Sequence, residues 1–161
     1  MIGHNHIGKN GRFGNQMFQY AALRGIAKAR GYDFTIPDGP RTDDEFTDEE
    51  EQHKLFMAFK MSGAKNIGLL NAGYTQEETF RYNDALVKTC PDDTNLYGYF
   101  QSEKYFKNAE EEVREDFEFR DDVKKLCNDI WKEIVAVEGH TEAISLHVRR
   151  TDHLIKPTYH P

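Results

Sequence analysis

The feature that most constrains this chain of 161 residues is the succession of a helical segment, a glycine and a short strand. From Asn15 onward, apolar residues recur at helical spacing, at Met17, Phe18, Ala21, Ala22, Ile26 and Ala29. Gly31 suits the left-handed position that follows a helix end. Residues 32–36 then predict a short strand that Pro37 stops. This order predicts half of an α/β unit.

The rest of the chain continues the alternation of helices and strands. Residues 1–14 are polar and glycine-rich and predict a loop, with a very short strand before it left open. Residues 43–51 hold seven carboxylates and predict a solvated loop and helix start. Residues 121–137 give the clearest helical pattern. Strand candidates are residues 67–70, 80–82, 96–100 and 143–148. The pattern therefore predicts an α/β fold, a mostly parallel sheet with flanking helices.

Composition and charge exclude several classes of protein. The net charge of −7 disfavours a nucleic-acid binder, which needs a basic face. Two cysteines do not make a disulfide framework, so we expect both to be reduced. The sequence has neither an apolar run of about twenty residues nor a secretory signal, so we expect no transmembrane segment and a cytoplasmic protein, with peripheral membrane association left open.

The strongest local signal is the segment LHVRRTD, residues 146–152. It places two arginines directly after an apolar strand candidate, with His147 and Arg149 on one face and Arg150 beside them. Ligands of open α/β sheets bind beyond the carboxyl ends of strands, and arginine suits bidentate phosphate contact. Asp152 could orient one guanidinium. A surface Arg–Asp pair at a strand end explains the spacing equally well.

The second signal is GRFGNQMFQYA, residues 11–21. Two glycines precede a helix start that carries Gly14, Asn15 and Gln16. Free N–H groups at a helix N-terminus favour anions, and glycine lets the backbone approach a ligand closely. The alternative is that the glycines only turn the chain and that Asn15 caps the helix.

Two other patterns near the N-terminus carry less weight. Gly3, Gly8 and Lys9 match the spacing of a phosphate-binding loop, but Asn10 stands where that loop needs a hydroxyl for magnesium. His4 and His6 have no acidic residue or cysteine near them in the sequence, and no D-x-D triplet occurs. We therefore expect no metal site and no cofactor.

Taken together, three segments resemble the α-1,2-fucosyltransferases, glycosyltransferase family 11. GNQMFQYA within residues 11–21 looks like the family's N-terminal signature. GYFQSEKYF, residues 98–106, is similar to a segment of bacterial members. HVRRTD, residues 147–152, resembles a motif shared with α-1,6-fucosyltransferases.

The resemblance implies a GT-B architecture, in which two Rossmann-like domains flank a cleft. It also implies an inverting, metal-independent transfer of fucose from GDP-fucose to the 2-hydroxyl of a galactose in a glycan acceptor. By this similarity, Arg149 would be the catalytic residue at the donor's β-phosphate. The other donor-binding residues would be His147, Arg150, Asp152, Gly14, Asn15 and Gln16.

Family members continue well beyond the arginine motif. We therefore expect residues 1–140 to form the acceptor-side Rossmann-like domain and residues 141–161 to begin a donor-binding domain whose remainder is absent. A chain of this kind would have little transferase activity alone. The competing hypotheses are a non-catalytic α/β module that binds a glycan or anion, and a fragment of a phosphate-loop kinase. The general base, the acceptor and the oligomeric state stay open.

Overall fold

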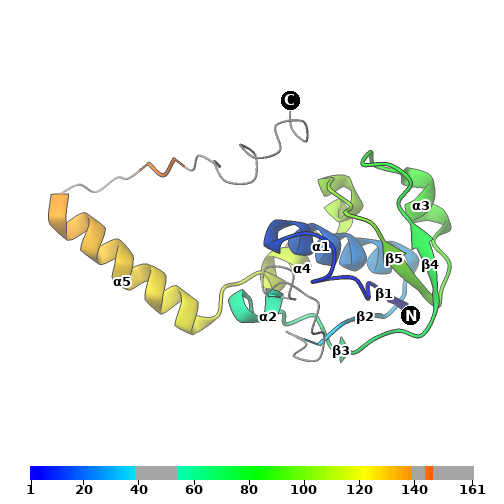
Figure 1. The fold of residues 1–161 in the computed structure, drawn as a ribbon, viewed down its shortest axis with the longest axis horizontal. Coiled ribbons are helices and arrows are strands. Elements are labelled where there is room, and N and C mark those ends of the chain that lie inside the picture. The colour runs from blue at the N-terminus through cyan, green and yellow to red at the C-terminus, as the bar shows by residue number, and fades with distance from the viewer. Residues whose placement is uncertain (39–53, 139–143, 147–161) are drawn as a thin grey trace. The chain divides into compact units, whose positions relative to one another are not determined.

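The structure is a computed structural model that describes residues 1–38, 54–138 and 144–146. The chain divides into two compact units, residues 1–124 and residues 125–161. The first unit contains all five described strands and is an α/β fold with an entirely parallel sheet and flanking helices, compatible with a Rossmann-like domain (Figure 1). The predicted α/β class and parallel sheet are confirmed. A boundary at residue 140 and a GT-B arrangement stay predictions.

The sheet has the strand order β3-β2-β1-β5-β4, and every neighbouring pair is parallel. Its strands are β1 (Ile2–Gly3), β2 (Phe34–Ile36), β3 (Asn66–Ile67), β4 (Gly73–Gln76) and β5 (Thr94–Tyr97). The central strand, β1, has only two residues, Ile2 and Gly3, and both pair with β2 on one side and β5 on the other. Strand β1 is the very short strand that the sequence left open before the N-terminal loop, and two residues are too few to show strand periodicity.

The connection from β3 to β4 is unusual because these are the two edge strands. Only six residue steps separate Ile67 from Gly73. Four strand spacings of about 4.8 Å amount to roughly 19 Å, and six fully extended residues reach about 20 Å. The segment must therefore run almost straight across one face of the sheet.

The side chains of Asn5 and Asn95 hold this crossing segment at Leu70 by hydrogen bonds. Asn5 donates from Nδ2 to the Leu70 carbonyl at 2.8 Å and accepts from the Leu70 amide at 3.0 Å. The Nδ2 of Asn95 donates to the carbonyls of Leu70 at 2.9 Å and Ala72 at 3.2 Å. A Cβ on Gly3 would lie 3.0 Å from the Leu70 Cβ. Since Ile2 points into the core and neighbouring strand residues alternate, the segment crosses the face opposite that core.

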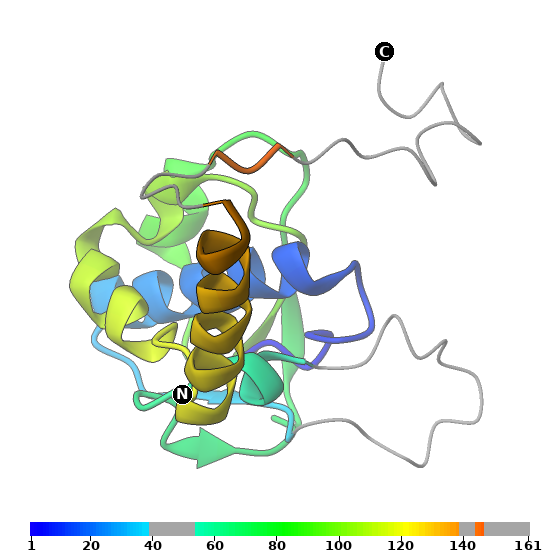
Figure 2. The same ribbon diagram turned by 90° about the vertical axis from the view of Figure 1, so that its left-hand side faces the viewer.

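The helices of the first unit gather on the core side of the sheet around α1. They are α1 (Phe13–Arg30), α2 (Leu55–Ala58), α3 (Asp84–Thr89), the 3₁₀ turns η2 (Glu103–Tyr105) and η3 (Lys107–Ala109), and α4 (Glu110–Asp116). Helix α5 (Asp121–Glu138) follows along the chain and continues into the second unit. In Figure 2 the yellow-green turns of η2, η3 and α4 lie beside the blue α1. Helix α1 therefore packs against the sheet on one side and against later helices on another.

The predicted helix at α1 is confirmed, but its buried face was wrongly centred. Phe18 is 37% exposed and Ala29 is exposed, although both were placed on the apolar stripe. Tyr20, Leu23 and Ala27 form the core side instead. The reason is that α1 is covered over a wide arc, so one narrow stripe does not describe it. Gly31 does end the helix in the left-handed region, with φ 69° and ψ 32°.

A buried carboxylate joins three parts of the first unit. Asp116, at the end of α4, is 1% exposed and accepts hydrogen bonds from the Tyr20 hydroxyl at 2.7 Å and the Gly63 amide at 2.5 Å. The Nε of Arg24 forms an ion pair with it at 3.1 Å. Burial and the hydrogen bond to Asp116 raise the pKa of Tyr20, so its hydroxyl stays a donor.

Other predicted elements were shifted or wrong. The strand expected at 96–100 lies two residues earlier as β5, and the one at 67–70 is only β3. Residues 80–82 form no strand, whereas β4 and α3 were missed. Residues 144–146, predicted inside a strand, pair with none of the described strands, and Ile144 is 99% exposed. An apolar alternation alone does not form a strand without a neighbour to supply hydrogen bonds. The acidic residues 43–51 lie outside the described residues.

The predicted helix at 121–137 is confirmed as α5. Its apolar side chains Leu126, Ile130 and Ile134 are 62%, 48% and 51% exposed. Cys127, on this helix, is exposed, and Cys90 is buried in the core; both are free thiols, as predicted.

Two glycines of α1 provide a matched test of the packing. A Cβ on Gly25 would lie 2.5 Å from the Phe106 Cα and even closer to the Tyr105 carbonyl oxygen, whereas a Cβ on Gly14 would meet nothing within 4 Å. We expect Gly25→Ala to destabilise the protein by about 1–3 kcal/mol or more through overpacking, although alanine is the better helix former. Gly14→Ala should be neutral or stabilise by up to about 1 kcal/mol.

Urea denaturation of the two variants measures this difference. Equal midpoints for Gly25→Ala and Gly14→Ala would show that α1 does not pack closely on residues 105–106.

Candidate functional site

The strand order reverses between β1 and β5, and the carboxyl ends of these two strands lie side by side. In open α/β sheets, ligands bind in the crevice outside the carboxyl ends at such a reversal point. The loop after β1 (residues 4–12) leads into α1, and the loop after β5 (residues 98–101) leads into η2. These two loops and the first turn of α1 therefore form the candidate site.

A buried glutamine of α1 links the two loops. Gln19 is fully buried, and its Nε2 donates to the carbonyl of Asn10 at 3.0 Å and to that of Gly98 at 3.1 Å. The Nε2 of His4, also fully buried, lies 3.3 Å from the same Gly98 oxygen. The Gly98 carbonyl therefore accepts two hydrogen bonds, and the buried Gln19 side chain connects the loops after β1 and β5.

Glu77, directly after β4, fixes the loop after β5. Its Oε2 accepts hydrogen bonds from the backbone amides of Tyr99 at 2.9 Å and Phe100 at 2.8 Å. Phe100 has a positive φ of 52°, and Gly98 has φ 157° in a place where a Cβ would lie 2.5 Å from the Glu77 Cβ. A non-glycine residue at positive φ costs energy and persists only where its surroundings hold it, and such residues cluster at functional sites.

The structure places Gly14 and Asn15 in the first turn of α1, at this edge of the sheet (Figure 1). Gly14 is exposed, and Asn15 is half-buried with its Oδ1 accepting a hydrogen bond from the Gln101 Nε2 at 2.6 Å. Gln16, by contrast, is fully buried, and its Oε1 accepts from the backbone amide of Lys54 at 2.9 Å. Gly14 and Asn15 are thus available to a ligand, and Gln16 has a packing role here. Donor binding by all three stays a prediction.

The other predicted site residues are His147, Arg149, Arg150 and Asp152, and all four lie outside the described residues. The structure therefore brings Gly14, Asn15 and Gln16 together in one turn and leaves the arginine motif as a prediction from the sequence.

The start of α1 is suited to bind an anion. Its N-cap residue, Arg12, has an extended backbone and makes no side-chain capping hydrogen bond, and no acidic residue lies in the first turn. Gly11 precedes it with φ 82°, a conformation that favours glycine. The first amides of a helix have no partner within the helix, and they carry the positive end of its dipole.

Burial controls the charge of the two histidines after β1. It lowers the pKa of His4 to about 4, against which the hydrogen bond with Gly98 has the smaller, opposite effect. Burial and the nearby Lys9 also lower the pKa of His6. His4 is therefore neutral at physiological pH. The described residues hold no group of three metal-binding side chains.

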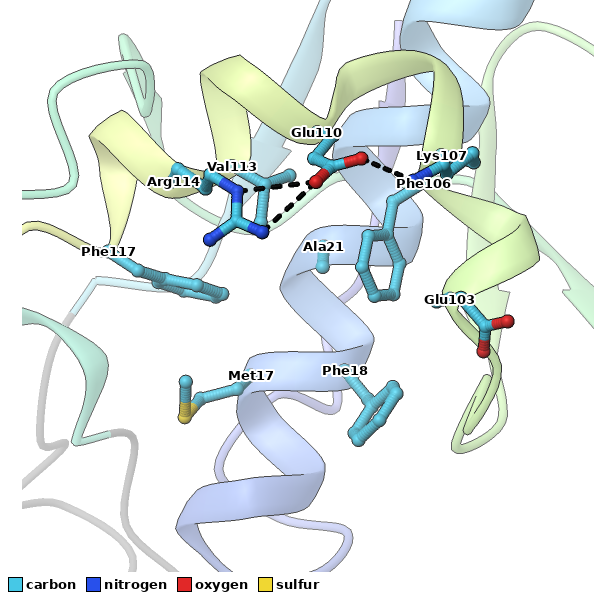
Figure 3. A pocket seen from close by; sticks show the side chains of 10 residues that line it. All are labelled: Met17, Phe18, Ala21, Glu103, Phe106, Lys107, Glu110, Val113, Arg114 and Phe117. Carbon is cyan, nitrogen blue, oxygen red and sulfur yellow. Dashed lines mark hydrogen bonds and ion pairs between the residues drawn. The ribbon is translucent and has the colours of Figure 1, made fainter.

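A separate groove of about 600 Å³ lies beside the outer side of α1. Figure 3 shows Met17, Phe18, Phe106 and Phe117 projecting into it, with Glu110 joined to Lys107 and Arg114 along one side. It has an apolar floor and a charged rim, and none of the predicted donor-binding residues that the structure describes, Gly14, Asn15 and Gln16, lines it.

Sequence reasoning missed Gln19, Glu77 and Gln101. Gln19 and Gln101 lie inside the segments that carry the family resemblance, which is the signal that could have singled them out. Glu77 follows a strand that the sequence did not reveal, so no signal pointed to it.

Comparison with known proteins gives one informative similarity. The alpha-1,2-colitosyltransferase of Escherichia coli is 27% identical to this chain over an alignment of 161 positions, which spans 89% of the chain and 53% of that protein. The chain thus spans about half the length of this relative. No protein-family model matches the chain, and no solved structure matches it significantly. No helix in the described ranges is long and apolar enough to cross a membrane.

The lowered pKa of His4 predicts a specific acid sensitivity. As the pH falls below about 6.5, the unfolded chain binds a proton at His4 before the folded chain does, so stability falls until the folded pKa of about 4 is reached. Between pH 7 and pH 5 this costs about 2 kcal/mol. We expect His4→Gln, whose amide can still donate to Gly98, to lose this part of the pH dependence.

Unfolding free energies from urea titrations at pH 7, 6 and 5 test this expectation, with His6→Gln as the control at a half-exposed position. If wild type and His4→Gln lose stability in parallel, His4 is not buried in its neutral form.

Proposed function

We propose that this chain is the N-terminal, acceptor-side part of a glycosyltransferase that moves a sugar from a nucleotide diphosphate to a glycan. The observation that carries the proposal is the similarity to a colitosyltransferase along 89% of the chain. The fold supports it, because the segment 11–16 lies where an open α/β sheet binds its ligand.

The donor we propose is GDP-fucose, and the acceptor group is the 2-hydroxyl of a galactoside. The motifs at residues 11–21, 98–106 and 147–152 resemble those of α-1,2-fucosyltransferases. The printed name of the relative gives the same α-1,2 linkage. Colitose is fucose without its 3-hydroxyl group, so GDP-colitose is the closest competing donor.

The transfer would invert the sugar's anomeric centre and use no metal. The acceptor's 2-hydroxyl oxygen forms the new bond to the anomeric carbon and loses its proton, while the bond from that carbon to the diphosphate oxygen breaks. The leaving GDP keeps the electron pair, so negative charge grows on its β-phosphate. A positioned guanidinium, which we assign to Arg149, stabilises that charge by roughly 1.5–3 kcal/mol.

The other predicted residues take supporting roles. His147 and Arg150 would assist Arg149, and Asp152 would hold their loop. Gly14 lets the donor approach the first turn of α1, where a Cβ would otherwise project into open space. Asn15 would bind a donor oxygen from the same turn.

Calorimetric titration with GDP, GDP-fucose and GDP-colitose tests the proposal. The proteins are the 161-residue chain, the full product of the reading frame that encodes it, and the Arg149→Ala and Asn15→Ala variants of that product. We expect the full product to bind GDP-fucose, and each variant to bind it at least tenfold more weakly, because each loses hydrogen bonds to a charged ligand. Arg114→Ala, which removes an exposed arginine paired with Glu110, is the matched control.

Transfer is measured in parallel by mass spectrometry, with lactose as a galactoside acceptor. Product formed from GDP-fucose supports the proposal. Product formed from GDP-colitose alone would show that GDP-colitose, and not GDP-fucose, is the donor. If the full product binds none of these nucleotides, the chain is a non-catalytic α/β module.

A further inference from the structure

A hydrogen bond between side chains connects the loop after β5 to the first turn of α1. The Nε2 of Gln101 donates to the Oδ1 of Asn15 at 2.6 Å, across 86 residues of sequence. An amide side chain has one oxygen that accepts and one nitrogen that donates. Because Gln101 occupies the Asn15 oxygen, the Asn15 Nδ2 is the group left to meet a ligand.

We propose that Gln101 is a positioning residue, which turns the Asn15 amide so that its Nδ2 donates to an oxygen of the bound nucleotide sugar. This inference rests on the proposed function and goes beyond it, because it assigns a role outside the predicted donor-binding residues. It also predicts that the site presents hydrogen-bond donors, and that it therefore selects ligand groups that accept hydrogen bonds.

Gln101 can act in this way because its backbone is fixed on both sides. Before it, Phe100 is fully buried and its amide is bound by Glu77 at 2.8 Å. After it, the Ser102 amide donates to the Phe100 carbonyl at 2.8 Å, and Ser102 is the N-cap of η2. The positive φ of Phe100 turns the chain sharply at this point. The backbone of Gln101 is therefore fixed, so the position of its side chain is set by the loop and not by Asn15.

Asn15 is held from the other side by Gly11. A Cβ on Gly11 would overlap the Asn15 amide, whose Nδ2 is the atom nearest to it and whose Cγ would be 2.8 Å away. The amide therefore folds closely over the Gly11 backbone, in space that any side chain at residue 11 would fill. Together, Gly11 and Gln101 leave the Asn15 amide one position and one orientation.

The orientation agrees with the charge of its surroundings. Asn15 lies in the first turn of α1, where the backbone amides and the helix dipole already favour an anion. An Oδ1 without a partner would repel a phosphate oxygen, whereas an Nδ2 over the Gly11 backbone adds a donor beside those of the first turn. The hydrogen bond from Gln101 therefore makes the side chain and the helix terminus act on the same ligand atoms.

A double-mutant cycle tests the action of Gln101 through Asn15. On the full product of the reading frame, GDP-fucose affinity is measured for Asn15→Ala, Gln101→Ala and the double variant. We expect Asn15→Ala to weaken binding at least tenfold, Gln101→Ala to weaken it about fivefold to tenfold, and the double variant to bind no more weakly than Asn15→Ala. Gln76→Ala removes an exposed glutamine at the end of β4 and is the matched control. Multiplicative effects of the two changes would overturn the proposal.

A second experiment needs no ligand, so it decides the proposal even if the proposed function fails. Nuclear magnetic resonance of the side-chain amides in the unliganded 161-residue chain should show the Gln101 Nε2 protons protected and the Asn15 Nδ2 protons open to solvent. In Gln101→Glu the new carboxylate only accepts, so the Asn15 amide should turn and its Nδ2 protons become protected. Gln76→Glu, with the same change of charge, should leave the Asn15 signals unchanged.

Protection of Asn15 Nδ2 in the wild-type chain would show the reverse orientation and overturn the proposal. Asn15 signals that do not respond to Gln101→Glu would do the same. Failure of the wild-type full product to bind any nucleotide sugar removes the proposed function, while the amide signals still decide the orientation.

Discussion

The candidate site depends on one topological constraint, the short extended segment that carries the chain from one edge strand of the sheet to the other. Because β4 forms at the far edge, β5 can return beside β1, and the loops after β1 and β5 become neighbours. The hydrogen bonds of Asn5 and Asn95 hold the segment at Leu70, and Gly3 leaves it room. Asn5 belongs to the loop after β1, whereas Gly3 and Asn95 lie in the strands β1 and β5, and together they determine which two loops form the site.

Helix α1 connects this framework to the site. Near its middle, Gly25 allows the backbone of residues 105–106 to approach closely, and Asp116 binds the Tyr20 hydroxyl. At its start, Gln19 joins the two loops from beneath while Asn15 meets Gln101 above. A change in how α1 packs would therefore move the site as well, because the same helix carries both sets of contacts.

The sequence predicted those parts of the fold that long local patterns determine. Helices α1 and α5, strand β2 and the left-handed Gly31 all follow from periodicity or from the conformational freedom of glycine. Strand β4 did not follow, and β1 was only left open, because the residues of these short strands form strands only through their neighbours in the sheet. Residues 144–146 illustrate the converse, since their apolar alternation meets no described strand.

The sequence pointed to part of the candidate site, for the same reason. Gly14 and Asn15 were singled out because glycines before a helix start are a local signal, and their donor binding stays a prediction. Glu77 and Gln101 make their contacts only once β4 and β5 lie side by side, which no local pattern reveals. The overall charge of −7 disfavours an anionic ligand, so the nucleotide sugar that we propose would have to be held by local donors. The amides of the first turn of α1 and the Asn15 Nδ2 would provide such donors without adding a titratable group. The Glu77 carboxylate binds the amides of Tyr99 and Phe100 through its Oε2, so this acid shapes the loop after β5.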